Sequence, residues 1–514
     1  MMKNIIKNIG IFSFFLLASS CSETEILDLT PINNISVDAS FSSPSLIASS
    51  MNGMYNAAAI GQFNATTING GRGYVWGAAY FQQNDNRGED VVNTATFYQL
   101  TYTATYDPNT ANNVYYWVDG YRLINRCNLI IEGVTKAAAN GVITDAVAKD
   151  YIGQAKFLRA ITHFELSVHF ARPYNETAGA SHTGIPYREV GVDTQDEIDA
   201  ELAKGRNTVA EVYQKVIADL NDAEANITNT TLTKATKGAA IAFKTRVYLA
   251  MRDWDKVISE GTKLSTLYKL EATPGAVFNS SYSNTESIFS LLQAATMNPG
   301  VNAALASQYK RRLLVCISPI IWRDTTWLAD DKRRSDVAGD PTSMVFTSSG
   351  RKFSNKYKDD VNYTDASPII RYAEVLLNMA EAYARKGDTV NGLAFLNMVR
   401  DRALADKATQ SYTGFDTAKD LVGAILKERR IEFLMEGKRW GDIHRLQKDD
   451  LFPMDGIPAK VANGNPPAAA YTLGTPYTGP YGVAAIPGSD FKFLWPIPQL
   501  ELDANPNLAQ NPGW

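Results

Sequence analysis

The sequence predicts a mainly α-helical protein built from antiparallel helical pairs, with a loop-rich face that carries short strands. Apolar residues recur every three or four positions in separated blocks, which is typical of helices that bury one side. Short connections join several of these blocks, and such connections place consecutive helices antiparallel. Segments rich in Asn, Thr, Ser and Gly lie between the blocks and predict long loops. With 514 residues, 45% of them hydrophobic, the chain can bury a large core.

The N-terminus has the pattern of a lipoprotein signal peptide. Lysines precede an apolar run of nine residues, Ile9–Leu17, which is about half of the ~20 needed to span a bilayer. Small residues follow, and then Cys21, as in a bacterial lipobox. A plain signal peptide with a chance cysteine is the alternative. We expect residues 1–20 to be a removed signal peptide and Cys21 to carry acyl chains that anchor the protein on a membrane.

Residues 21–36 form a polar, lipidated tether in this interpretation, and residues 37–514 form a single domain. The acidic stretch Ser22–Glu25 resembles the surface-export signal of Bacteroidetes lipoproteins. Because no later stretch approaches membrane-spanning length, we expect the mature protein to lie on the membrane without crossing it.

Helical stripes fall within residues 41–60, 112–268 and 368–447. The clearest of them run from Trp117 to Ile131, Phe157 to Val168, Ala240 to Ala250, Ile369 to Tyr383 and Val422 to Trp440. The predicted helix Lys237–Met251 is followed closely by another from Trp254, and Ile369–Lys386 is followed by Leu393–Ala403. Alanines at the close-packing positions favour tight contacts. These helical pairs resemble degenerate tetratricopeptide units of about 34 residues.

Three segments lack such stripes: residues 61–113, 270–365 and 451–514. The last is rich in Pro and Gly, and Trp495–Pro498 is expected to be extended, because proline disfavours helix in the residue before it. We expect this stretch to pack against the scaffold. Long loops on rigid helices are where function usually lies.

Charged residues interrupt the apolar stripe of the helix predicted around 421–440. Charges at such positions must be paired, which predicts structural ion pairs; the residues are Arg429, Glu432, Glu436 and Arg439. Local partners, or an arginine of a neighbouring helix such as Arg400, are expected. The alternative is a glycosidase-like set of carboxylates that includes Glu428, but five basic residues nearby would keep these carboxylates ionised, which is wrong for a general acid.

Other catalytic, metal and nucleic-acid signatures are weak or missing in the sequence. There is no HExxH, no G-x-S-x-G and no phosphate-binding G-x-x-x-x-G-K-[ST]. A net charge of −4 argues against nucleic-acid binding. Asp85, Glu89 and Asp90 form an acidic stretch for which Ca²⁺ binding is an alternative to a solvated loop. Cys127 and Cys316 are expected to be separate buried thiols, with a disulfide left open.

The C-terminal third carries three recognisable motifs. These are Ile370–Ala382 (IRYAEVLLNMAEA), Glu428–Asp442 (ERRIEF followed by EGKRWGD), and Phe493–Pro498 (FLWPIP) with the terminal NPNL and QNPG. Gln154–Ala160 and Arg246–Ala250 match the same family upstream, in the same order. Together they resemble the SusD/RagB family of Bacteroidetes outer-membrane lipoproteins.

The resemblance implies a scaffold of four tetratricopeptide-like units and a place on the outer membrane, facing the cell exterior. Family members cap a TonB-dependent transporter of the SusC type and capture nutrients, most often glycans and sometimes peptides. Because catalytic motifs are missing from the sequence, we expect a binding protein and not an enzyme, without a cofactor unless the acidic stretch binds Ca²⁺. A peptide-binding lipoprotein and a transporter lid without ligand contacts remain alternatives.

Ligand residues cannot be carried over from the family, because they lie in its variable loops. Sugars are met by aromatic rings and by amide or guanidinium groups. The loop-borne candidates are Trp76, Tyr80, Asn84, Arg87, Tyr309, Trp322 and Trp327. The alternative for each is a buried residue that anchors its own loop.

Overall fold

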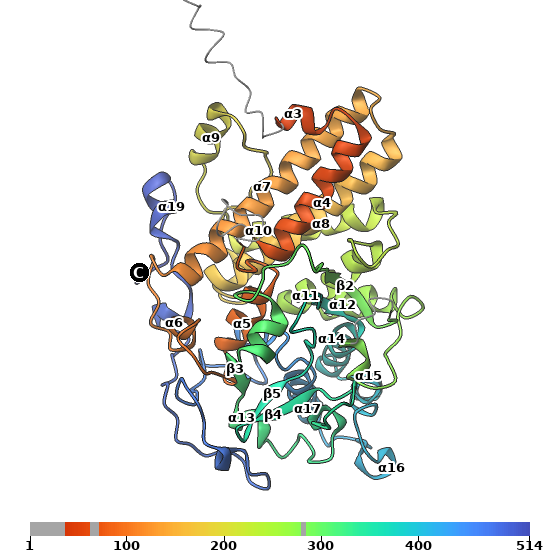
Figure 1. Cartoon of the computed structure of the whole chain (residues 1–514), viewed down its shortest axis with the longest axis vertical. Coiled ribbons are helices and arrows are strands. Elements are labelled where there is room, and N and C mark those ends of the chain that lie inside the picture. Colours follow the sequence, from red (N-terminus) through yellow and green to blue (C-terminus); the bar gives the residue numbers. More distant parts are fainter. Residues whose placement is uncertain (1–35, 62–70, 279–283) are drawn as a thin grey trace, which may run out of the picture.

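The computed structural model describes residues 36–61, 71–278 and 284–514. The expected signal peptide, Cys21 and most of the tether lie outside the described residues. Within the described ranges, no helix is long and apolar enough to cross a membrane. The predicted mainly helical fold is confirmed (Figure 1).

Long helices pack in succession through the molecule, each against the next. In chain order they are α4 (Pro44–Ile60), α7 (Ala111–Ala139), α8 (Asp145–Phe170), α10 (Val209–Asn226), α11 (Lys237–Met251), α12 (Trp254–Thr262), α14 (Tyr372–Arg385), α15 (Thr389–Arg400) and α17 (Ala418–Glu432). Figure 1 shows the N-terminal group, α4, α7, α8 and α10, at one end and α14, α15 and α17 towards the other. The count of four tetratricopeptide-like units stays a prediction.

Shorter helices lie between and around the long ones. They are α3 (Val37–Ser40), α5 (Ala78–Asn86), α6 (Gln99–Tyr102), α9 (Gln195–Leu202), α13 (Pro319–Trp322), α16 (Lys407–Gln410), α18 (Arg439–Arg445) and α19 (Gln499–Ala504). Single turns complete the set: η1 (Ala178–Ala180), η2 (Ala276–Phe278), η3 (Ser307–Arg311), η4 (Lys332–Arg334), η5 (Ala468–Tyr471) and η6 (Phe491–Phe493).

Side-chain caps explain where many helices begin. Thr194 and Thr208 form capping boxes with Glu197 and Glu211, which satisfies free amides at the starts of α9 and α10. Gly387, at φ 84°, follows α14 and allows the tight turn into α15.

The described residues form three two-stranded antiparallel sheets. They pair β1 (Val91–Asn93) with β3 (Val315–Ile317), β2 (Ser287–Leu291) with β6 (Ser367–Arg371), and β4 (Val345–Ser348) with β5 (Arg351–Ser354). The first two sheets join segments that are far apart in the sequence, whereas β4 and β5 form a hairpin. The β2–β6 pair is irregular in register, and β6 leads directly into α14.

Two boundary predictions are wrong. The helix predicted around 421–440 is two helices, because Met435 and Gly437 adopt positive φ angles of 60° and 66° and turn the chain between α17 and α18. The segment predicted as Ile369–Lys386 begins as strand β6, and its helix starts only at Tyr372. A further helix, α5, lies in the segment expected to be a loop.

The segment Trp495–Pro498 packs on the scaffold, as expected. The Trp495 ring stacks on His169 of α8 with centroids 4.2 Å apart, and its backbone amide donates to the His169 carbonyl at 3.1 Å. Arg87 lies between Trp495 and Trp440, with its guanidinium 3.5 Å from the Trp440 ring centroid. The C-terminal motif therefore closes the core instead of forming a ligand site.

Candidate functional site

The residues proposed from the sequence as ligand contacts are inside the protein. Trp76 and Tyr309 are 0% exposed, and Trp322 is 4% exposed. Tyr80, Asn84, Arg87 and Trp327 are equally enclosed. The expectation that these seven residues lie exposed on loops is wrong.

Their hydrogen bonds explain the burial. The Trp76 Nε1 donates to Thr162 Oγ1 at 3.0 Å, and the Trp322 Nε1 donates to the Tyr471 carbonyl at 3.1 Å. Each indole thus fixes its own segment to the scaffold. Asn84 of α5 donates through Nδ2 to Glu165 of α8 at 3.0 Å, so its amide is not available to a ligand.

The acidic stretch in the same region is also buried, which excludes a solvated loop. Arg439 holds Glu89 through Nε and Nη2, at 3.0 and 2.6 Å, and Arg430 pairs with Asp90. Burial raises the pKa of Asp85 to about 8, although Tyr309 donates to it at 2.9 Å. Among the described residues, no cluster of three His, Cys, Asp or Glu side chains could hold a metal ion. Cys127 and Cys316 are separate, buried, free thiols.

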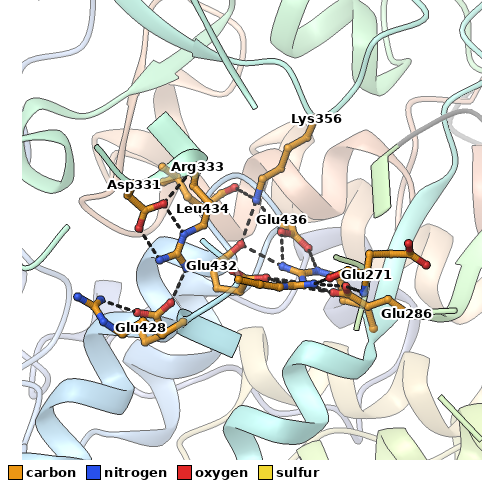
Figure 2. A network of polar contacts seen from close by, with 12 residues as sticks. Glu271, Glu286, Asp331, Arg333, Lys356, Glu428, Glu432, Leu434 and Glu436 are labelled. Carbon is orange, nitrogen blue, oxygen red and sulfur yellow. Dashed lines mark hydrogen bonds and ion pairs between the residues drawn. The ribbon is translucent and has the colours of Figure 1, made fainter. Parts of the chain in front are cut away.

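Charges of the family motif form part of a buried network, whose partners outside the motif the sequence did not predict except for Arg400 (Figure 2). Five carboxylates and five cationic groups alternate in it: Glu286, Asp331, Glu428, Glu432 and Glu436 with Arg333, Lys356, Arg371, Arg400 and Arg402. Arg371, at the end of β6, contacts Glu286, Glu432 and Glu436 at 2.7 to 2.9 Å. The network ties β2, β6 and α17 together.

The expected ion-pair residues have other partners than expected. Arg429 pairs with Asp442 of α18 at 3.0 Å, and Glu436 pairs with Arg371 and Lys356 instead of Arg439 or Arg400. Burial alone would raise the pKa of Glu436, but the adjacent Arg371 and Lys356 hold it below its usual value. Glu436 is therefore ionised, as is Glu432, whose pKa neighbouring arginines hold well below its usual value against the effect of burial, and this does not suit a general acid.

Lys356 connects this network to a surface cleft. Its Nζ lies 2.6 Å from Glu436 Oε1 and donates to the carbonyl of Leu434 at 2.9 Å (Figure 2). The cleft above it has a volume of about 430 Å³, within the range of about 300–1,000 Å³ typical of small-ligand sites. Its floor is thus held rigidly by buried ion pairs.

The lining of this cleft mixes apolar and hydrogen-bonding groups. It includes Val277, Phe278, Asn284, Ser287, Ser290, Tyr357, Lys358, Asp359, Thr364, Asp365 and Pro368. Phe278 is partly exposed, with Lys356 Nζ 5.1 Å from its ring centroid. Asp365 accepts from the amides of Lys358 and Asp359 at 3.1 and 2.8 Å, which fixes one wall. We call this site the Phe278 cleft.

An aromatic–arginine pair stands beside one wall of the Phe278 cleft. Tyr363 directly precedes the lining residue Thr364, and its hydroxyl accepts from Arg311 Nη1 at 2.6 Å. Arg311 is exposed, and Tyr363 is partly exposed. Ring and guanidinium are thus available to a ligand that extends beyond the cleft.

A larger groove of about 980 Å³ lies between α3, α4, α7 and the chain around 188–192. Its walls are mostly apolar, with Leu46, Ile124 and Val190 among them, and Arg126 lines it as well. Its size exceeds that of the Phe278 cleft, and amide and hydroxyl groups line both sites. We favour the Phe278 cleft for a hydroxyl-rich ligand because buried ion pairs at Lys356 hold its floor rigidly.

Known proteins match the chain along most of its length. A model described as "SusD family" matches residues 334–514, and one described as "Starch-binding associating with outer membrane" matches residues 25–249. SusD-like protein P2 from Formosa agariphila is 25% identical, over 78% of this chain and 80% of its own length.

Solved structures share the fold. A SusD superfamily protein from Bacteroides fragilis superposes with a TM-score of 0.73 and 28% identity, covering 91% of this chain and 99% of its own. A SusD-like carbohydrate binding protein from Bacteroides vulgatus has a TM-score of 0.69 and 20% identity, over 91% and 97% of the two chains. The resemblance stated from the motifs is thereby confirmed, and this chain belongs to the SusD/RagB family, whose members are binding proteins and not enzymes.

Proposed function

We propose that the protein is a cell-surface lipoprotein that captures oligosaccharides in the Phe278 cleft and passes them, chemically unchanged, to a SusC-like TonB-dependent transporter. The observation that carries this proposal is the cleft itself. A ring, an amide, two serine hydroxyls and two carboxylates surround one cavity of ligand size on a rigid floor. Such a set can stack on the apolar face of a sugar and bond its hydroxyls. The family models, one described as starch-binding, favour a carbohydrate over other ligands.

Calorimetry with purified protein tests the ligand class. Oligosaccharides and peptides are titrated into the parent, into Phe278→Ala and into Phe415→Ala. Phe415 is a partly exposed ring that does not line the cleft, so it is the matched control. We expect micromolar-to-millimolar oligosaccharide affinity that Phe278→Ala weakens about tenfold and Phe415→Ala leaves unchanged. Equal affinity in all three proteins would exclude the cleft.

A peptide ligand is the second candidate, and the 980 Å³ groove favours it. Its apolar walls suit side chains, and Arg126 has no hydrogen-bond or ion-pair partner among the described residues, so it could meet a carboxylate. Peptide binding that Arg126→Ala abolishes would support this alternative. Absence of any binding would leave the role of a transporter lid.

Anchoring at Cys21 is part of the same proposal. Replacing Cys21 by Ala removes the site of acylation, so the protein should move from the outer-membrane pellet to the soluble fraction. A variant that still pellets and resists high salt would show that lipidation at Cys21 is wrong. Protease treatment of intact cells checks the expected outward orientation.

A further inference from the structure

A long exposed segment near the C-terminus carries no charge. Residues 461–489 contain no Asp, Glu, Lys, Arg or His, although 20% of the whole chain is charged. We call this segment the charge-free loop. Most of its residues are exposed, including Leu473 at 40% and Tyr481 at 49%. Exposed surface is normally where charged residues gather, so their absence here needs an explanation.

The charge-free loop is held firmly in place. Its turn η5 packs against α13 and β5 (Figure 1). The Tyr471 hydroxyl donates to the Ile317 carbonyl at 2.9 Å. The backbone carbonyl of Tyr471 accepts from Trp322 Nε1. Backbone pairs join Lys460 to Val483, with N···O distances of 2.9 and 3.1 Å. The exposed side chains therefore sit on a prearranged surface.

Two tyrosines and an arginine form the centre of this surface. The rings of Tyr477 and Tyr481 meet edge to face with centroids 5.8 Å apart. The Tyr477 hydroxyl donates to the Pro480 carbonyl at 2.7 Å. Arg323 binds the Thr475 carbonyl and hydroxyl at 2.8 and 2.6 Å, and its guanidinium lies 5.9 Å from the Tyr477 ring. Tyr481 keeps half of its surface open to solvent.

The chemistry of the loop fits an uncharged sugar chain better than a protein. Protein interfaces bury about 800 Å² per partner around several large side chains. Here two large exposed side chains, Leu473 and Tyr481, and the partly exposed Tyr477 stand among small Ala, Pro, Gly and Thr residues. A sugar needs little more than a ring to stack on and nearby polar groups. A neutral polymer has no charge for the loop to match.

We propose that the charge-free loop is a second carbohydrate-contact surface, which holds a neutral polysaccharide through Tyr481 and Tyr477, apart from the Phe278 cleft. The inference rests on the proposed function in that both sites take carbohydrate. It adds a distinct role, which is retention of the polymer at the cell surface before shorter pieces enter the cleft.

Affinity electrophoresis in gels containing amylopectin, galactomannan or anionic alginate tests the proposal. The mature chain with Cys21→Ala is compared with additional Tyr481→Ala, Tyr481→Phe and Leu500→Ala changes. Leu500 of α19 is also 49% exposed and is the matched control. We expect at least one neutral polymer to retard the parent, and its affinity to fall roughly five- to tenfold in Tyr481→Ala only. Retardation by a neutral polymer should be the same at low and high salt, because the polymer carries no charge that Arg323 could attract.

Oligosaccharide calorimetry separates this inference from the proposed function. The Tyr481→Ala variant should bind a short oligosaccharide as tightly as the parent does. The Phe278→Ala variant should bind that oligosaccharide more weakly but still bind the polymer. Unchanged polymer affinity in Tyr481→Ala, or no retardation of the parent, overturns the inference and leaves the cleft untouched. Loss of a co-purifying protein from Tyr481→Ala, with polymer binding intact, would make the loop a protein interface instead. Loss of oligosaccharide binding only in Phe278→Ala supports the cleft, whatever the polymer result.

Discussion

Buried charges decide stability at single residues. Glu436 is 1% exposed and contacts both Arg371 and Lys356. Glu436→Gln keeps the shape of the side chain but leaves these two cations partly uncompensated, and breaking a buried pair costs about 3–5 kcal/mol. We expect that loss in the free energy of unfolding measured with urea. Glu189→Gln, which breaks the exposed pair with Lys215, is the control and should cost at most about 1 kcal/mol. Equal stability of both variants would contradict the buried network.

Acid should destabilise the protein through its enclosed histidines. Burial lowers the pKa of His169 to about 4 and that of His444 to about 3, and it lowers the pKa of His163 as well. Arg87 donates to His169 Nδ1 at 3.0 Å, so a protonated ring would face a cation. Histidines of the unfolded chain are protonated below a pKa of about 6.5, whereas those of the folded protein are protonated only at a much lower pH.

These lowered pKa values set the direction of the pH effect on the free energy of unfolding. The contribution of the neutral histidines to stability is complete above pH ~6.5 and is lost as the pH falls towards about 3. Each histidine contributes about 1.4 kcal/mol per pH unit in that window. Urea unfolding at pH 7.5, 6 and 5 measures the slope, and His444→Phe should reduce it. Constant stability between pH 7.5 and 5 would show that the rings are protonated in the folded state.

The candidate site shows how far single residues can be predicted. Trp76 and Trp322 were chosen because they lie in polar segments, yet the indole N–H of each bonds inward. Composition cannot tell a ring that anchors a loop from one that the loop displays. Phe278 lies in the segment 270–365, whose loop-rich character was predicted, but the cleft exists only because β2, β6 and the chain around Lys356 meet there.

At the level of elements, the turn between α17 and α18 depends on Gly437. Its φ is +66°, and an added Cβ would lie 3.0 Å from the Phe81 Cα and 3.0 Å from the Tyr80 ring. Gly437→Ala should therefore cost about 1–3 kcal/mol of stability. Gly441→Ala, within α18 and with open space around it, should be neutral or slightly stabilising. Thermal unfolding of the two variants compares them, and equal midpoints would show that the turn tolerates a side chain.

Periodicity predicted elements well where one face is apolar. Helix α11 begins and ends at the predicted residues, Lys237 and Met251. Helix α5 was missed, because its second half, Gln82–Asn86, is polar although fully buried. Asn84 and Asp85 bond the tertiary partners Glu165 and Tyr309, and such partners are invisible to a local pattern. The α17–α18 break was missed for a related reason, since the apolar spacing continues across the turn.

At the scale of the whole molecule, the family motifs lie in the interior, whereas the candidate ligand surfaces lie elsewhere. The Trp495 stack joins the C-terminal motifs to α8, and the ion pair between Arg246 of α11 and Glu374 of α14 likewise links the N-terminal half to a motif. The motifs that identify the family are therefore those that hold the scaffold. The exposed surfaces, namely the Phe278 cleft and the charge-free loop, lie outside the motifs that carried the resemblance. This separation explains why sequence predicted the family but not the ligand contacts.

Binding strength should rise with the length of the oligosaccharide. A monosaccharide can bind within the Phe278 cleft of about 430 Å³ but cannot also reach the Tyr363–Arg311 pair beyond its wall. Each further ring contact adds roughly 1–3 kcal/mol by area burial, less the cost of ordering the longer chain. We expect affinity to increase from the monosaccharide to about the trisaccharide and then to level off. Calorimetry with a length series measures this, and Tyr363→Ala should flatten the increase without affecting the affinity for the monosaccharide.

Mass spectrometry after incubation should recover every oligosaccharide at its original length, because a binding protein releases its ligand intact. An affinity independent of length in the parent would restrict contact to one sugar, and shortened products would make the protein an enzyme.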